Sequence, residues 1–95
     1  MSTQHTPGPW LTNESTEHWG RVNVTVCAAF TANEIATAWQ GTTEVNRANA
    51  RLIAAAPDLL NALVMVLDDP QALDGRPRTA EVVREAVAKA TGGAA

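Results

Sequence analysis

The sequence predicts an α+β domain, with a small antiparallel sheet of about three strands followed by two or three helices. Between residues 19 and 40, apolar and polar side chains alternate, as in strands with one buried face. From Glu44 to Leu67 the apolar side chains instead recur at steps of three and four, which is the period of a helix. A second helical pattern follows and ends at Gly92. A chain of 95 residues has the length of one domain, so we expect a single domain over 1–95.

Residues 1–9 are expected to form an extended arm. Pro7-Gly8-Pro9 breaks regular structure, because residues before proline avoid helical conformations. Trp10 comes next, and burial of its large apolar side chain would anchor the arm to the domain. Residues 10–12 are the first candidate strand, and the polar run 13–17 is predicted to be a turn.

The sheet is predicted to occupy residues 10–40. A central strand over 19–30 has one apolar side, which carries Val22, Val24, Val26, Ala28 and Phe30. A polar break at 31–34 separates it from a strand at 35–40, in which Ile35, Thr37 and Trp39 share a side. A four-residue connection favours an antiparallel hairpin, so we expect the strands to form a meander.

The helical part is predicted over 42–91, with Thr42 or Thr43 as the first N-cap. Within 44–67, two neighbouring apolar rows make a face that is wider than the seam of a coiled coil. A short chain has a small core, and oligomerisation is a common way to cover such a face. We therefore expect this helix to pack against both the sheet and a second subunit.

Pro57 interrupts the long helical pattern, because proline lacks a backbone N–H and its ring crowds the preceding turn. The helix either kinks and continues, or stops near Ala55 and restarts with Pro57 as its first residue. The apolar rows keep their phase across the proline, so a kinked and nearly continuous helix is expected. A loop at 70–78 and a last helix with Thr79 as N-cap should follow, and residues 92–95 should fray.

Charge and apolar content exclude several classes of protein. The net charge is −3 and no block of Lys or Arg occurs, so we expect no bulk DNA or RNA binding. No apolar run reaches about 18 residues, so no membrane span is expected. The single cysteine, Cys27, cannot form an internal disulfide, which suits the cytoplasm.

No pattern typical of catalysis or metal binding occurs in the sequence. His5, His18 and Cys27 lack the spacing of a zinc site and do not form a recognisable nucleophile–base pair. Neither phosphate-loop pattern, GxxxxGKS/T or GxGxxG, is present. Asp68 and Asp69 lie at a predicted helix end, where solvated acids are common. We therefore expect no enzyme, no bound metal and no cofactor.

A ligand site is predicted where the sheet meets the long helix. Trp39 offers an aromatic plane just before the helix start, where the backbone N–H groups of 43–46 can bind an anion. Polar and basic side chains follow within two turns. Together these groups would suit a nucleotide, whose base would stack on Trp39 and whose phosphate would be bound by the helix start and an arginine. Arg47 and Arg51 are alternatively a solvated helix face, and Arg84 would act across a dimer. The candidate ligand residues are Trp39, Asn46, Arg47, Asn49 and Arg84.

Two segments of the chain resemble known proteins. His5-Thr6-Pro7-Gly8-Pro9-Trp10 and the run from Ala48 to Leu60, ANARLIAAAPDLL, look like the signature segments of a large set of small phage and prophage proteins. The ending Ala88-Lys89-Ala90-Thr91-Gly92 is similar to the end of that set. The layout, a sheet and then helices, also resembles the first-described family of phage anti-Thoeris proteins, which are nucleotide sponges.

This second resemblance implies a phage immune-evasion protein that acts in the host cytoplasm. Proteins of that family sequester a cyclic ADP-ribose signal, can bind CBASS cyclic oligonucleotides, and assemble as dimers and hexamers. The resemblance implies a nucleotide pocket between protomers at Trp39, Asn49 and Arg84, without catalysis. The alternative is a phage accessory module that binds a host protein through its apolar helix face.

Overall fold

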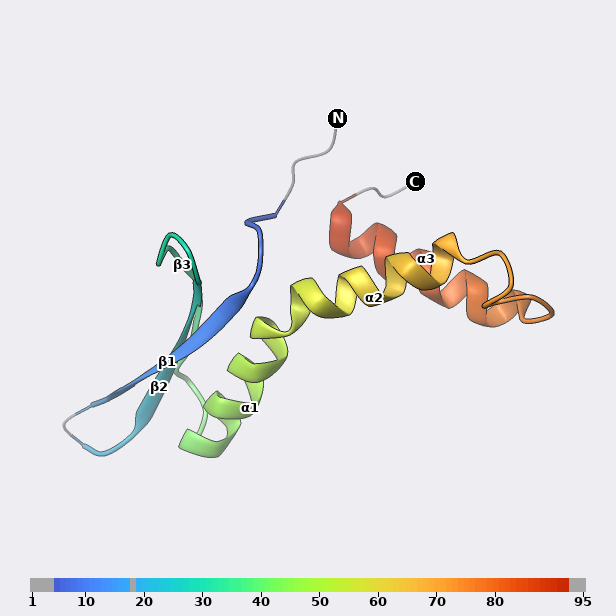
Figure 1. Cartoon of the computed structure of the whole chain (residues 1–95). Helices are drawn as coiled ribbons and strands as arrows, with labels where there is room; N and C mark the ends of the chain where they lie inside the picture. Colours follow the sequence, from blue (N-terminus) through green and yellow to red (C-terminus); the bar gives the residue numbers. More distant parts are fainter. Residues whose placement is uncertain (1–4, 18, 93–95) are drawn as a thin grey trace. The chain divides into compact units, whose positions relative to one another are not determined.

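The computed structural model describes residues 5–17 and 19–92 of the chain. The elements are, in order, β1 (Trp10–Thr16), β2 (Val22–Ala28), β3 (Glu34–Ala38), α1 (Thr43–Ala54), α2 (Ala56–Asp68) and α3 (Pro77–Thr91) (Figure 1). The strands form one antiparallel sheet in the order β1-β2-β3. The predicted α+β class, with a small sheet followed by helices, is therefore confirmed.

The chain divides into two compact units at Pro57. The first, residues 6–57, contains the sheet and α1, and is called the sheet unit below. The second contains His5, α2 from Asp58, the following turn and α3, and its residues 58–92 are called the helical unit. That these units form a single domain over 1–95 stays a prediction.

The core of the sheet unit lies between β2 and α1. Val24 and Val26 of β2 and Ala50 of α1 are fully buried, and Ala28 is nearly so. Trp10, Val22, Ile35, Ala38, Ile53 and Ala54 pack around this cluster. The predicted apolar side of the central strand is correct except at Phe30, which is 86% exposed. Phe30 lies beyond the end of β2, where the chain turns and Ala32 donates a hydrogen bond to the Ala28 carbonyl.

Strand β1 is longer than predicted. It pairs with β2 along its whole length, from Trp10 opposite Ala28 to Thr16 opposite Val22. The turn predicted at 13–17 is therefore wrong for 13–16. These polar residues lie exposed on an edge strand, where pairing with β2 rather than burial of side chains holds the backbone extended.

Strand β3 contains a β-bulge that changes the predicted faces. Thr37 pairs with Thr25, but Cys27 pairs with Glu34, so β3 has one extra residue at Ile35. A bulge redirects side chains, because two residues on one strand oppose a single residue on its neighbour. Ile35 packs on the core, whereas the Thr37 hydroxyl lies 3.3 Å from that of Thr25 on the opposite face. The prediction that Ile35 and Thr37 share a side is therefore wrong.

The long helical pattern is divided into two helices at Ala55. Helix α1 ends at Ala54 and α2 begins at Ala56, so a one-residue interruption separates two nearly continuous helices, and the second begins at Ala56 rather than at Pro57. Pro57 has no N–H to donate, and it is tolerated in the first turn of a helix for that reason. Pro57 is buried, and a Cβ built on Gly8 would lie 3.2 Å from the Pro57 Cβ. The arm and the helix break therefore meet within the sheet unit.

The helical unit begins its last helix earlier than predicted. Helix α3 starts at Pro77 with Arg76 as N-cap, because proline is well suited to the first helical position, so Thr79 is not the cap. The predicted end is confirmed: Gly92 closes α3 in the left-handed conformation, with φ of 72°. Residues 93–95 of the expected fraying tail lie outside the described residues. No single helix in the described ranges is long and apolar enough to cross a membrane; α1 and α2 pass on length and composition only as an interrupted pair.

Candidate ligand-binding site

A cavity of ≈ 410 Å³ lies in the sheet unit, where β3 ends and α1 begins. It is lined by Thr37, Ala38, Trp39, Gln40, Gly41, Asn46, Asn49, Leu52 and Ile53, and is called the Trp39 cavity below. Small-molecule sites typically have volumes of about 300–1,000 Å³. The predicted meeting point of Trp39 with the start of the helix is therefore a real hollow in the sheet unit.

Asn46 fixes the backbone around this cavity. Its side chain is 1% exposed, and its amide nitrogen donates a hydrogen bond of 2.9 Å to the Val22 carbonyl. Its side-chain oxygen accepts a hydrogen bond of 3.0 Å from the Gly41 N–H. A Cβ at Gly41 would lie 2.8 Å from Val45 Cγ1, so any other residue here would force the Val45 side chain to shift. This bridge holds α1 against β2 and places Trp39 at the cavity wall.

The start of α1 is capped within the chain. The Thr42 hydroxyl accepts a hydrogen bond of 3.3 Å from the Val45 N–H, which confirms Thr42 as the N-cap. The Asn46 N–H donates to the Thr42 carbonyl at 2.8 Å. The prediction that the N–H groups of 43–46 are free for an anion is therefore wrong for Val45 and Asn46. The helix start offers a weaker anion site than its sequence indicates.

The walls of the Trp39 cavity are aromatic, aliphatic and amide groups. Trp39 is 50% exposed and Leu52 is 65% exposed, so both present apolar surface to a ligand. Gln40 and Asn49 are exposed and bring amide groups that can donate and accept hydrogen bonds. None of the lining residues is charged. Such a surface suits a flat, uncharged group with hydrogen-bonding edges.

Arg47 lies outside this cavity and is held by Glu14 of β1. Its Nε and Nη2 donate to the two Glu14 carboxylate oxygens at 3.0 and 2.9 Å, which makes a bidentate ion pair. The hydrogen bond from Arg47 lowers the pKa of Glu14 below its usual value, and the charges of Arg47 and Arg51 act in the same direction. The same hydrogen bond raises the pKa of Arg47. The structure therefore does not bring Arg47 to Trp39, because the Arg47 guanidinium is paired with Glu14 between β1 and α1.

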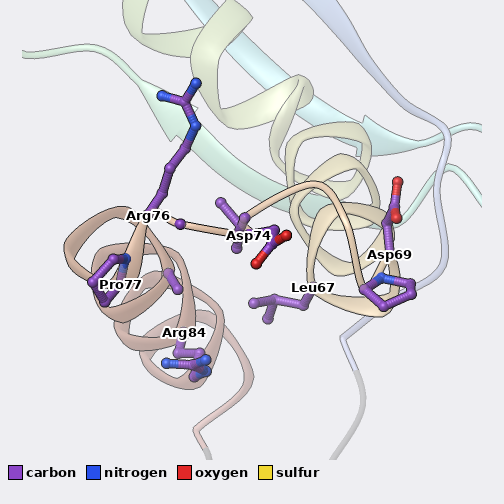
Figure 2. Close-up of a pocket in the computed structure, with 10 residues that line it drawn as sticks. Leu67, Asp69, Asp74, Arg76, Pro77 and Arg84 are labelled. Carbon is purple, nitrogen blue, oxygen red and sulfur yellow. The ribbon is translucent and has the colours of Figure 1, made fainter.

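Arg84 belongs to the helical unit and lines a separate cavity of ≈ 480 Å³. This cavity is formed by the end of α2, the turn and the start of α3 (Figure 2). Figure 2 shows Arg76 pointing away from Leu67, whereas Arg84 projects from α3. Of the five predicted ligand residues, Trp39, Asn46 and Asn49 line one cavity, and Arg47 and Arg84 do not.

The prediction missed Gln40, Leu52 and Ile53 as lining residues. Leu52 and Ile53 follow Asn49 at steps of three and four, which place them on the same side of α1. The helical spacing in the sequence could therefore have identified Leu52 and Ile53 as neighbours of Asn49 in the site. Gln40 carried no such signal, because it lies in the irregular link between β3 and α1.

No candidate metal centre is found in the described ranges, where no three His, Cys, Asp or Glu side chains gather. His18, one of the three residues considered for such a site, lies outside the described residues. Cys27 is half-buried on β2, on the side of the sheet opposite Val26 and the core. The candidate site is therefore the uncharged Trp39 cavity.

The comparisons with known proteins give the chain a family. Searches of curated proteins and of solved structures found no match. A family model described as Salmonella phage P22 protein Y8K6 matches residues 1–94. Since the match covers almost the whole chain, this phage-derived protein belongs to the family described as Salmonella phage P22 protein Y8K6.

Proposed function

We propose that this phage-derived protein binds a nucleotide by its base in the Trp39 cavity and sequesters it without catalysis. The observation that carries the proposal is the half-exposed indole of Trp39 beside the exposed amides of Gln40 and Asn49. Stacking on an aromatic side chain contributes about 1–3 kcal/mol per base, and amides pair with the edges of bases. The ligands implied by the resemblance are cyclic ADP-ribose signals and CBASS cyclic oligonucleotides.

The charge distribution in the sheet unit favours recognition of the base over recognition of the phosphate. No cation lines the cavity, and Arg47 is already paired with Glu14. The capped start of α1 leaves fewer N–H groups for a phosphate than an uncapped helix would. The phosphates of a bound nucleotide would therefore face solvent, and salt should weaken binding only slightly.

Calorimetry with cyclic ADP-ribose isomers, cyclic dinucleotides and cyclic trinucleotides tests this proposal. Adenosine and guanosine should be included as probes that present the base without a phosphate. We expect binding that Trp39→Ala weakens by roughly tenfold or more, since one stacking contact is lost. Trp19→Ala, which removes an exposed indole from the β1–β2 turn, is the matched control and should leave affinity unchanged. If none of these ligands binds or raises the unfolding temperature, the proposal is wrong.

A protein-interaction module is the second candidate function. The observation that favours it is the exposure of apolar side chains on α2, of which Met65 is 72% exposed. In this alternative the face binds a host protein. Light scattering separates the two readings: a monomer that leaves this face exposed favours a host partner, and a homo-oligomer that covers it argues against one.

A further inference from the structure

The Trp39 cavity is lined by two amide side chains that have no partner among the described residues. Gln40 and Asn49 are exposed, and neither side chain makes a hydrogen bond to another residue in 5–17 or 19–92. Asn46 is buried instead, and both ends of its amide are bonded to backbone groups. The Thr37 hydroxyl lies 3.3 Å from a hydroxyl on β2. The polar side chains available to a ligand are therefore two neutral amides.

Asn49 is the amide with the more fixed position. It lies on α1 one turn after Asn46, whose hydrogen bonds of 2.9 and 3.0 Å hold this part of the helix against β2 and the link that follows β3. Gln40 lies in that irregular link and has one more rotatable side-chain bond. Binding through Gln40 would therefore cost more conformational entropy than binding through Asn49. Asn49 is the better placed of the two for a specific contact.

An amide side chain carries an acceptor and a donor side by side, and this pattern matches adenine better than guanine. The 6-amino group of adenine donates beside an accepting ring nitrogen on each of two edges, with N1 on one edge and N7 on the other. Guanine presents two acceptors, O6 and N7, on the second of these edges, so an amide satisfies only one of them there. On its other edge, guanine adds a 2-amino donor that a single amide leaves unpaired.

The side chains that usually recognise guanine do not line this cavity. Arg and Lys donate to O6 and N7 of guanine, and a carboxylate accepts from its N–H groups. Among the described residues that line the cavity none is charged, and Arg47 is paired with Glu14. Leu52 and Ile53, which follow Asn49 along α1, are apolar. An unpaired amino group beside them would lose its hydration without a replacement, which disfavours guanine.

We propose that Asn49 makes the Trp39 cavity selective for adenine over guanine. The base stacks on the Trp39 indole, while the Asn49 amide accepts from the 6-amino group and donates to the neighbouring ring nitrogen. The ligand class is therefore a nucleoside or nucleotide that carries a 6-aminopurine. This inference rests on the function proposed above, and it adds which base is selected and which residue selects it.

Calorimetry on the full chain with two matched pairs of ligands tests the selectivity. The pairs are adenosine with guanosine, and cyclic di-AMP with cyclic di-GMP, so that the base is compared with and without phosphates. We expect the adenine member of a pair to bind roughly tenfold or more tightly than the guanine member, since one bidentate contact distinguishes them. Equal affinities within each pair, weakened alike by Trp39→Ala, would overturn the selectivity but keep the nucleotide site. If none of the four ligands binds, both proposals are wrong.

Asn49→Asp tests the residue that selects the base. A carboxylate has no donor for N1 or N7 of adenine, but it accepts from the N–H groups of guanine. We expect the affinity for adenosine to fall roughly tenfold and the affinity for guanosine not to fall. Nucleosides are used because the new charge would also repel phosphates.

Asn13→Asp is the matched control for this substitution. It makes the same change on β1, where Asn13 is exposed, pairs with Thr25 and does not line the cavity. The ratio of the two nucleoside affinities should therefore stay as in the unaltered protein. An equal loss of both affinities in Asn49→Asp, or an unchanged preference for adenosine, would contradict the role proposed for Asn49.

Discussion

Asn46 and Asn49 lie one turn apart on α1 but have different surroundings. The Asn46 side chain is buried and bridges Val22 and Gly41, whereas Asn49 is exposed at the Trp39 cavity. Buried amides that are fully hydrogen-bonded hold their neighbours in place. Asn46 is therefore a positioning residue, and Asn49 is the amide available to a ligand.

We expect Asn46→Ala to destabilise the protein by about 1–3 kcal/mol for each buried group that loses its partner. Asn49→Ala is the matched control, and its free energy of unfolding should change by less than about 0.5 kcal/mol, as for most surface substitutions. Urea unfolding followed by tryptophan fluorescence measures both values. Equal destabilisation by the two substitutions would contradict the roles assigned to these residues.

At the scale of elements, Glu14 and Arg47 join strand β1 to helix α1. The pair is bidentate, and both side chains are partly exposed. Because the folded protein lowers the pKa of Glu14, the ionised carboxylate stabilises the fold. That contribution is fully present above the usual pKa of 4.5 and is lost as pH falls through the lower folded value.

We therefore expect Glu14→Gln to lower the unfolding temperature at neutral pH, with a difference from the unaltered protein that shrinks below pH 4.5. Thermal unfolding by circular dichroism over a pH series measures this difference. Glu34→Gln removes the same charge from β3, where Glu34 forms no ion pair with any described residue, and serves as control. A difference in unfolding temperature that grows as the pH falls would contradict the lowered pKa of Glu14 in the folded protein.

The break between α1 and α2 depends on two segments that are distant in sequence. Pro57 removes a helical hydrogen bond, which permits a break but does not require one. Gly8 leaves just enough room for the buried Pro57 ring, so the arm packs on the helix end. The sequence offered both outcomes at Pro57, because only the packing of the arm distinguishes them.

At the scale of the whole molecule, the core cluster around Val24, Val26 and Ala50 is confined to one unit. Val24, Val26, Ala50 and the side chains around them all lie within residues 6–57. The ladder between β1 and β2 and the bridge made by Asn46 lie there too. The sheet unit therefore contains the interactions that a small domain needs, although domains of about 60 residues have a narrow margin.

We expect a chain that ends at Pro57 to keep the sheet and to unfold cooperatively. The physical reason is that the core cluster loses none of its members by this truncation. Tryptophan fluorescence during urea unfolding measures the transition, and Val26→Ala in the same short chain should shift it to lower urea by loss of core packing. A short chain without a cooperative transition would contradict this expectation.

Prediction from sequence succeeded for features that depend on near neighbours. Thr42 caps α1 through the Val45 N–H three residues later, and Gly92 ends α3. The alternation along β2 identified its buried valines, because strand periodicity is local. The position of Trp39 beside a helix start also followed from order along the chain.

The remaining parts of the site depended on contacts between distant residues. Arg47 pairs with Glu14 across 33 positions, and Asn46 bonds to Val22 across 24. Local spacing contains no information about such partners, so both side chains were predicted as ligand contacts. Arg84 was assigned to the same site, but it lies in the helical unit.

The sequence by itself determined the order of the elements, the N-cap of α1 and the end of α3, and it indicated a phage protein. Only the tertiary structure decided that β1 extends to Thr16, that β3 bulges at Ile35 and that the Trp39 cavity contains no charge. The physical reason is the range of the interactions. Caps and periodicity act over a single turn or strand, whereas pairing, burial and charge neutralisation join residues that the chain order keeps apart.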